Sequence, residues 1–182
     1  MDRKKAIEAT NQPELAELYR LLELLKEKLD GAMKEQFGRS LPFAEVLFDR
    51  WQRAKHLGFG EGTSVYDSCC LFGQVKVGKN TWVGPYTILD GSGGLEIGSN
   101  CSISAGVHIY THDTVEWAIS GGEKSFNYEP VKIGDNCYVG PGTIIAKGVE
   151  IGSGTIIGAN SFVNRSFPAG SKIAGSPARS IN

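Results

Sequence analysis

Aliphatic residues recur every six positions through most of the chain from residue 65 onward. The series contains only Val, Leu and Ile, and it is interrupted by a two-residue insertion after residue 89 and by a longer gap after residue 109. Its fourteen positions are Val65, Leu71, Val77, Val83, Leu89, Ile97, Ile103, Ile109, Ile133, Val139, Ile145, Ile151, Ile157 and Val163. An internal repeat of this kind takes precedence over any local assignment of helix or strand.

A second position, four residues after each aliphatic one, holds a small side chain in twelve of the fourteen repeats. The exceptions are Asp113, beside the gap, and Phe167, at the end of the array. The small residue and the next aliphatic residue are two apart, so both point to the same side of an extended strand. The rest of each repeat, often Gly followed by Asp, Ser or Asn, supplies a turn.

One strand and one turn cannot bury their apolar side alone, so successive repeats must wind and stack around a shared interior. The hexapeptide period therefore predicts an all-β fold, a parallel β-helix of about four to five coils at three repeats per coil. We expect this coil to occupy residues 61–182, with a loop protruding at about residues 113–130. That loop is polar and contains glycine, and long loops in compact domains are often functional.

The chain before the repeat is predicted to be a short α-helical segment, residues 1–60. Leucines recur at three- and four-residue steps after Pro13, with Asn11 as a candidate N-cap and Gly38 beyond the helix end. A second, shorter helix is expected from about residue 42 to residue 56.

Composition and charge exclude several classes of partner. The net charge of -1, without a basic run, argues against nucleic acid or an anionic membrane as the main partner. No segment approaches the roughly 20 apolar residues of a membrane span, and the N-terminus lacks a secretory pattern. The location expected from these features is the cytoplasm. Cys69, Cys101 and Cys137 occupy small positions and are expected to be packed, reduced thiols, whereas the pattern assigns no role to Cys70.

The second half of the chain resembles the hexapeptide-repeat acyltransferases. The resemblance rests on VHIYTHD before the gap and on EPVKIGDNCYVGPGTIIAKGVEIGSGTIIGANSFVNRSFPAGSKIAGSPAR after it, and it extends over about residues 65–180. Within that family it is similar to the galactoside and maltose O-acetyltransferases and to acetyltransferases of surface-polysaccharide sugars. It implies a left-handed parallel β-helix, a homotrimer, acetyl-CoA as co-substrate without a metal, and transfer of acetyl to a hydroxyl or amine of a sugar or nucleotide sugar.

His112 is the candidate general base. Imidazole has an unperturbed pKa of roughly 6.5, so its neutral form accepts a proton near pH 7. His112 precedes Asp113, where the small-residue rule fails, and it matches the catalytic histidine of the family. Asp113 and Glu116 are the nearest carboxylates in sequence that could orient it, although Asp113 could equally just begin the loop.

Three further residues are candidates for binding the acceptor. Asp90 lies at the two-residue insertion, which corresponds to the region that supplies acceptor-binding groups in sugar acetyltransferases, and Tyr86 lies nearby. His108 points outward from its strand and could line the same cleft. A turn aspartate and a solvated or interface histidine are the alternatives. The loop aromatics are expected mainly at a subunit interface, with a sugar ring as the alternative partner; they are Trp117, Phe126 and Tyr128.

The late repeats carry the residues that the resemblance assigns to acetyl-CoA. Small residues let pantetheine approach the backbone, and arginines pair with phosphates. The positions are Tyr138, Gly140, Ala159, Asn164, Arg165 and Arg179. Pro141 falls where this branch commonly has serine, and since proline has no amide hydrogen, a contact from that amide to an oxyanion or thioester is impossible. Gly142 is named as a substitute donor by position alone.

Two alternatives to an acetyltransferase use the same coil. A non-catalytic scaffold or binding trimer would need no acetyl-CoA groove. A zinc-dependent carbonic anhydrase would need three histidines to converge, and the chain has only three, of which His56 lies outside the repeat.

Overall fold

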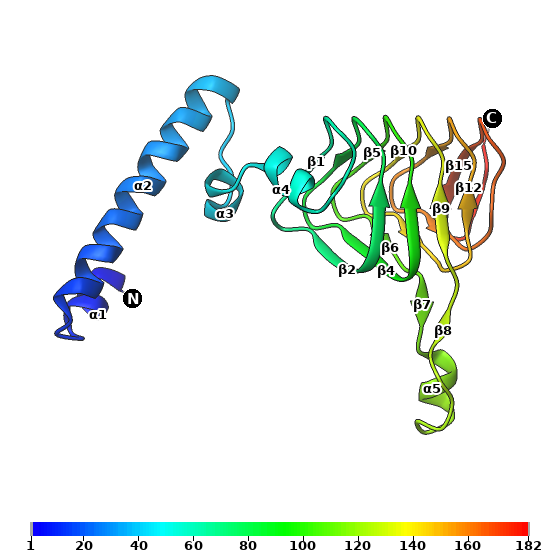
Figure 1. Cartoon of the computed structure of the whole chain (residues 1–182), viewed down its shortest axis with the longest axis horizontal. Coiled ribbons are helices and arrows are strands. Elements are labelled where there is room, and N and C mark those ends of the chain that lie inside the picture. The colour runs from blue at the N-terminus through cyan, green and yellow to red at the C-terminus, as the bar shows by residue number, and fades with distance from the viewer. Residues whose placement is uncertain (1, 182) are drawn as a thin grey trace. The chain divides into compact units, whose positions relative to one another are not determined.

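The computed structural model describes residues 2–181 and divides the chain into two compact units, Met1–Asp49 and Arg50–Asn182 (Figure 1). The division falls earlier in the chain than residue 60, so the last helix before the repeat belongs to the second unit.

Residues 2–49, the described part of the first unit, contain the helices α1 (Arg3–Glu8), α2 (Pro13–Phe37) and α3 (Phe43–Leu47). Helix α2 begins at Pro13 and ends at Gly38, whose φ of 63° is the left-handed conformation of a helix C-terminus. Gln12, rather than Asn11, occupies the N-cap position of α2. Leu18 and Leu21 of this helix are 52% and 46% exposed. Within residues 2–181, no helix has both the length and the apolar content needed to cross a bilayer.

The single helix expected from residue 42 to residue 56 is two helices, because Phe48 adopts an extended conformation at φ -107° and ψ 132°. The second of these helices, α4 (Arg50–His56), packs on the first strand of the coil. Ala54 is buried there, and Arg53 donates hydrogen bonds to the backbone carbonyls of Tyr66 and Cys69. Helix α4 thereby covers the N-terminal end of the coil, as terminal segments of solenoids do.

The second unit is a parallel β-solenoid whose short strands stack into three faces. Face 1 contains β1 (Ser64–Val65), β3 (Trp82–Val83), β5 (Ser102–Ile103), β10 (Tyr138–Val139), β13 (Ile156–Ile157) and β15 (Lys172–Gly175). Face 2 contains the first parts of β2 (Cys70–Val77) and β4 (Ile88–Ile97), then β6 (His108–Ile109), β11 (Ile144–Ile145) and β14 (Phe162–Val163). Face 3 contains the second parts of β2 and β4, then β9 (Val131–Ile133) and β12 (Glu150–Ile151).

The last strand, β16 (Ala178–Ser180), turns back and pairs antiparallel with β15. Face 1 has six parallel strands, more than the four to five coils expected, because β15 lies beyond the last repeat recognised in the sequence.

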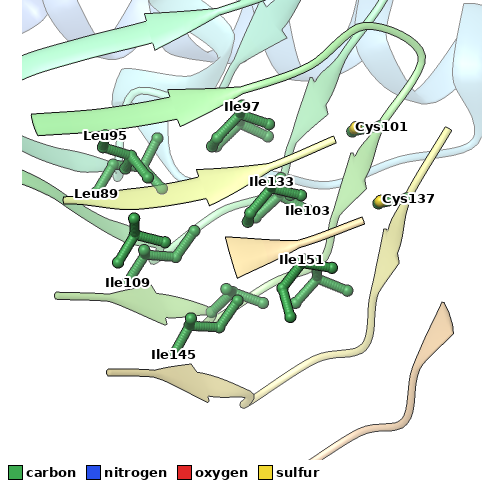
Figure 2. Close-up of a cluster of buried hydrophobic side chains, with 14 of the residues drawn as sticks. Leu89, Leu95, Ile97, Cys101, Ile103, Ile109, Ile133, Cys137, Ile145 and Ile151 are labelled. Carbon is green, nitrogen blue, oxygen red and sulfur yellow. The ribbon is translucent and has the colours of Figure 1, made fainter. Parts of the chain in front are cut away.

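The six-residue pattern is confirmed as the core of the coil. Thirteen of the fourteen aliphatic positions are buried, and the remaining one, Leu71, is partly buried against them. Figure 2 shows part of this core, in which aliphatic side chains of successive coils lie against one another and Cys101 lies beside Cys137. Cys69, Cys101 and Cys137 are buried free thiols as expected, whereas Cys70 is exposed.

Both interruptions of the period are visible in the strands. The gap is an arm formed by β7 (His112–Asp113), α5 (Val115–Ile119) and β8 (Asn127–Tyr128), which extends away from the stacked strands (Figure 1). The two-residue insertion lies inside β4, where the pairing with β2 is irregular between Gly73 and Val75. Each interruption lies where face 2 ends and face 3 begins.

Candidate active site

The interruptions meet in space, because successive coils place Asp90 beside the root of the arm. Leu89 pairs with Ile109 of the next coil, so the residues that follow each of them are neighbours. The Nδ1 atom of His112 lies 2.6 Å from Oδ2 of Asp90, although the two residues are 22 apart in sequence. The Asp90 residue is 1% exposed, and the His112 side chain is 29% exposed.

The Asp90 carboxylate is surrounded by hydrogen-bond donors. Oδ2 accepts from the Thr111 amide at 2.9 Å and from the Thr111 hydroxyl at 3.2 Å, and Oδ1 accepts from the Ser92 amide at 3.0 Å. Burial alone would raise the pKa of Asp90, but the hydrogen bonds from Ser92, Thr111 and His112 outweigh it and hold the pKa well below its usual range. Asp90 is therefore ionised at neutral pH.

An ionised carboxylate can only accept hydrogen bonds, so Nδ1 of His112 must donate. In the neutral imidazole that leaves Nε2 as the acceptor nitrogen. A buried carboxylate that fixes the tautomer of a partly exposed histidine is the arrangement used to prepare a general base.

The arm supplies a second set of contacts to this imidazole. The ring of Tyr128 stacks on His112 at a centroid distance of 5.5 Å, and the ring of Phe126 does so at 6.2 Å. Trp117 packs edge-on against Phe126 at 5.8 Å rather than against His112. These aromatic contacts lie within one chain, which the sequence did not anticipate.

Asp113 and Glu116, the candidates for orienting His112, are paired elsewhere, and for Asp113 the structure favours the alternative that it begins the loop. Asp113 points toward Lys147, with 3.5 Å between Oδ2 and Nζ, and also accepts from the Val115 amide. Glu116 pairs with Lys124. Neighbours along a strand point to opposite sides, so Asp113 cannot face the same group as the histidine before it. The available signal for Asp90 was that both breaks of the period occur at the same corner of the coil.

Neither of the other acceptor candidates contacts His112. His108 lies outward on face 2, with Nδ1 3.5 Å from the hydroxyl of Tyr110. Tyr86 lies in the turn that precedes face 2, is 61% exposed and has a φ of 59°. The strand of face 2 separates that turn from the corner that contains His112.

The residues predicted to bind acetyl-CoA divide between the two edges of face 2. Gly140 and Ala159 lie in adjacent turns at its starting edge, where a Cβ on Gly140 would be 2.5 Å from the Ala159 amide nitrogen. Close stacking of the turns thus requires a glycine there whether or not a ligand binds. Arg179 of β16 is paired with Ala174 of β15, and a Cβ on Gly158 would lie 2.9 Å from the Cβ of Ala174, so this pair lies close to the same stack of turns. Tyr138 is 43% exposed on face 1, just before this edge.

Asn164 and Arg165 follow β14 and lie at the far edge of face 2, the edge that also contains His112. The guanidinium of Arg165 lies 5.0 Å from the centroid of the Phe167 ring. The amide of Gly142, considered as an oxyanion donor, instead donates to the Ala105 carbonyl at 3.1 Å. Among residues 2–181, no three His, Cys, Asp or Glu side chains form a group that could hold a metal ion.

Comparison with known proteins agrees with this architecture. A family model described as bacterial transferase hexapeptide (six repeats) matches residues 130–165, and one described as hexapeptide repeat of succinyl-transferase matches residues 74–111. Both models describe the six-residue repeat that forms the parallel coil, and each covers about a fifth of the chain. The resemblance of the chain to the hexapeptide-repeat acetyltransferases is confirmed by the relatives it matches.

Two of these relatives are from Escherichia coli. The putative colanic acid biosynthesis acetyltransferase WcaF is 33% identical over 107 residues, which are 58% of this chain and 56% of WcaF. Galactoside O-acetyltransferase is 29% identical over 155 residues, covering 85% of this chain and 68% of that protein. The chain therefore spans little more than half the length of WcaF.

Solved structures show the same fold. AntD, an N-acyltransferase from Bacillus cereus solved with dTDP and 3-hydroxybutyryl-CoA, matches with a TM-score of 0.62 at 27% identity, over 68% of this chain and 70% of AntD. A hexapeptide-repeat acetyltransferase from Vibrio cholerae, VCA0836, matches with a TM-score of 0.64 at 24% identity, over 88% of this chain and 91% of that one. This second likeness supports the left-handed β-helix fold.

Proposed function

We propose that this protein is an acetyl-CoA-dependent acetyltransferase whose acceptor is a hydroxyl or amine of a sugar or nucleotide sugar. The observation that carries the proposal is the 2.6 Å contact between the buried Asp90 carboxylate and Nδ1 of His112 at an interrupted corner of a hexapeptide coil. The relatives are named acetyltransferases, and AntD was solved with an acyl-CoA and dTDP, so the donor and acceptor classes are consistent with the site.

In the proposed reaction, Nε2 of His112 takes the proton of the acceptor group as its oxygen or nitrogen attacks the thioester carbonyl. The carbon–sulfur bond breaks, the acetyl group stays on the acceptor, and the imidazolium returns the proton to the departing thiolate. Asp90 remains ionised throughout, keeps the ring in the required tautomer and stabilises its positive charge.

We further propose that the working form is a homotrimer with its site between subunits. The predicted cofactor positions Gly140, Ala159 and Arg179 lie at the starting edge of face 2, whereas His112 lies beyond its far edge. Gly142, at the starting edge, and Ala146, at the far edge, are four positions apart in sequence, which corresponds to about 13 Å along an extended strand. This separation is compatible with a site in which the groove of one subunit delivers the thioester to the histidine of another.

The outward surfaces of the coil support this assembly. Tyr138 and Ile156 on face 1 and Ile144 on face 2 are 43%, 47% and 40% exposed, and such apolar side chains favour association. Face 3 instead presents the register-paired Lys76, Glu96, Lys132 and Glu150, with Lys76 and Glu96 in an ion pair at 3.0 Å. A charged ladder of this kind is typical of a solvated surface.

The decisive experiment compares His112→Ala with His56→Ala. Release of CoA from acetyl-CoA is measured over a panel of sugars, amino sugars and nucleotide sugars, and acetyl-CoA binding is measured by calorimetry. We expect His112→Ala to bind acetyl-CoA normally and to lose about 10²–10⁴-fold in kcat, whereas His56→Ala retains wild-type activity. Full activity of His112→Ala would exclude it as the base, and absence of acetyl-CoA binding by the wild-type protein would favour a non-catalytic binding trimer.

A further inference from the structure

The root of the arm is a two-stranded ribbon with two different sides. His112 of β7 is paired with Tyr128 of β8, and Asp113 is paired with Asn127, in antiparallel register. Because side chains alternate along a strand, His112, Phe126 and Tyr128 lie on one side of the ribbon. Asp113 of β7 and Asn127 of β8 lie on the other side of the ribbon.

The first side consists of aromatic contacts to the imidazole. The planes of Tyr128 and Phe126 make angles of 27° and 24° with the His112 ring, so both rings are nearly parallel to it. Their centroid distances of 5.5 and 6.2 Å fall within the range of stabilising aromatic pairs. We call these two rings the aromatic pair.

The second side fixes the ribbon to the coil. Lys147, which follows β11, forms ion pairs with both Asp113 and Glu129, one residue from each strand of the ribbon or its continuation. The Lys147 side chain is only 15% exposed. The Glu129 amide also donates to the Thr111 carbonyl at 2.9 Å, so the ribbon is attached next to the residue that hydrogen-bonds Asp90.

We propose that the aromatic pair, Phe126 and Tyr128, positions the His112 imidazole for proton transfer. The hydrogen bond from Nδ1 to Asp90 holds one ring atom, and the side chain can still tilt its ring through small coupled rotations about the Cα–Cβ and Cβ–Cγ bonds. Stacked rings restrict this tilt, so Nε2 is aimed in one direction when the arm lies in this place. The inference rests on the proposed role of His112 as base and adds that the arm completes the base.

The kinetic test replaces the rings by an aliphatic side chain of comparable bulk. Tyr128→Leu and Phe126→Leu are expected to lower kcat by about tenfold or more, because a misaimed base transfers protons less efficiently. KM is expected to change by less than about twofold, which separates positioning from substrate binding. Tyr128→Phe keeps the aromatic ring, so this variant is expected to retain the wild-type kcat. Ile119→Ala changes an arm residue that is 73% exposed, and it is also expected to leave kcat unchanged.

A spectroscopic test reports on the ring without any turnover. The chain has three histidines, so selective ¹³C labelling gives three resolvable imidazole signals, which His112→Ala and His56→Ala assign. Stacked rings shift the His112 ring protons upfield. Tyr128→Leu or Phe126→Leu should therefore move the signal of the His112 ring protons downfield. Tyr128→Phe and Ile119→Ala should leave that signal in place.

The outcomes separate this inference from the proposed function. Wild-type kcat or an unshifted His112 signal in both leucine variants would overturn the role of the aromatic pair, even if His112→Ala is inactive. A kcat as low in Tyr128→Phe or in Ile119→Ala as in the leucine variants would also overturn the role of the aromatic pair. Full activity of His112→Ala would instead remove the base itself, while the shift of the signal would still show whether the rings stack.

Discussion

Replacing Asp90 by asparagine tests the central contact of the site with almost no change in shape. The Thr111 amide and Nδ1 of His112 both donate to Oδ2, whereas the Ser92 amide donates to Oδ1, so the single amide oxygen of asparagine cannot serve both places. Where the NH₂ group replaces Oδ2, Nδ1 of His112 must accept, and the ring hydrogen moves to Nε2. In either orientation the negative charge that stabilises the imidazolium is lost, and with it the support of the proposed base.

The magnitude of the effect follows from what the base contributes. General base catalysis supplies about 10²–10⁴ in rate, so we expect Asp90→Asn to lower kcat by that factor at pH 7. The double variant Asp90→Asn/His112→Ala should be no slower than His112→Ala alone, because both changes remove the same function.

The same substitution has a pH-dependent effect on stability. Hydrogen bonds hold the pKa of Asp90 below its unfolded value of 3.8, so its ionisation stabilises the folded state at any pH above that value. The contribution is lost as pH falls from 3.8 toward the folded pKa. We expect Asp90→Asn to lower the free energy of unfolding by about 1–3 kcal/mol at pH 7, and the deficit to shrink below about pH 4.

The matched control is Asp135→Asn. Asp135, like Asp90, accepts a hydrogen bond from the backbone of an adjacent coil, from the Ser99 amide at 2.6 Å, but its carboxylate has no hydrogen bond to a histidine. It should lose stability without losing kcat. Both variants are assayed by CoA release and by urea unfolding at several pH values. A kcat for Asp90→Asn within about threefold of wild type would refute the argument that Asp90 sets the tautomer.

Three further predictions concern the coil and the arm. Ile151→Ala removes a side chain that is 1% exposed and should lower the free energy of unfolding by about 2–5 kcal/mol. Glu150→Ala, at the outward neighbour, should change it by less than about 1 kcal/mol. Equal losses of the two variants in urea unfolding would contradict a strand with one inward and one outward side. Tyr86→Asn should raise the free energy of unfolding by about 0.5–1 kcal/mol, because a bulky residue is strained at a φ of 59° where asparagine is tolerated. A free energy of unfolding below that of the wild-type protein would argue against strain at this position. Lys147→Ala should speed amide hydrogen exchange across residues 114–128 but not in the coil, and unchanged exchange would show that Lys147 does not anchor the arm.

The comparison of sequence and structure is clearest for the coil. A six-residue period dictates which side chains are inward, because each repeat has the same strand and turn and differs only in its place in the stack. The burial of the aliphatic positions and of three thiols could therefore be read from spacing alone. The helix break at Phe48 could not, since no proline or glycine marks it in the sequence.

The site needed the tertiary structure for a different reason. The sequence singled out His112 and Asp90 as residues at two interruptions, but it paired the histidine with a carboxylate close in sequence. Stacking of successive coils brings residues 22 apart into a 2.6 Å contact, and the antiparallel ribbon brings Tyr128 back over the same ring. Repetition along the chain determined what lies inside the coil, whereas contacts between coils, which a linear period does not encode, decided what surrounds His112.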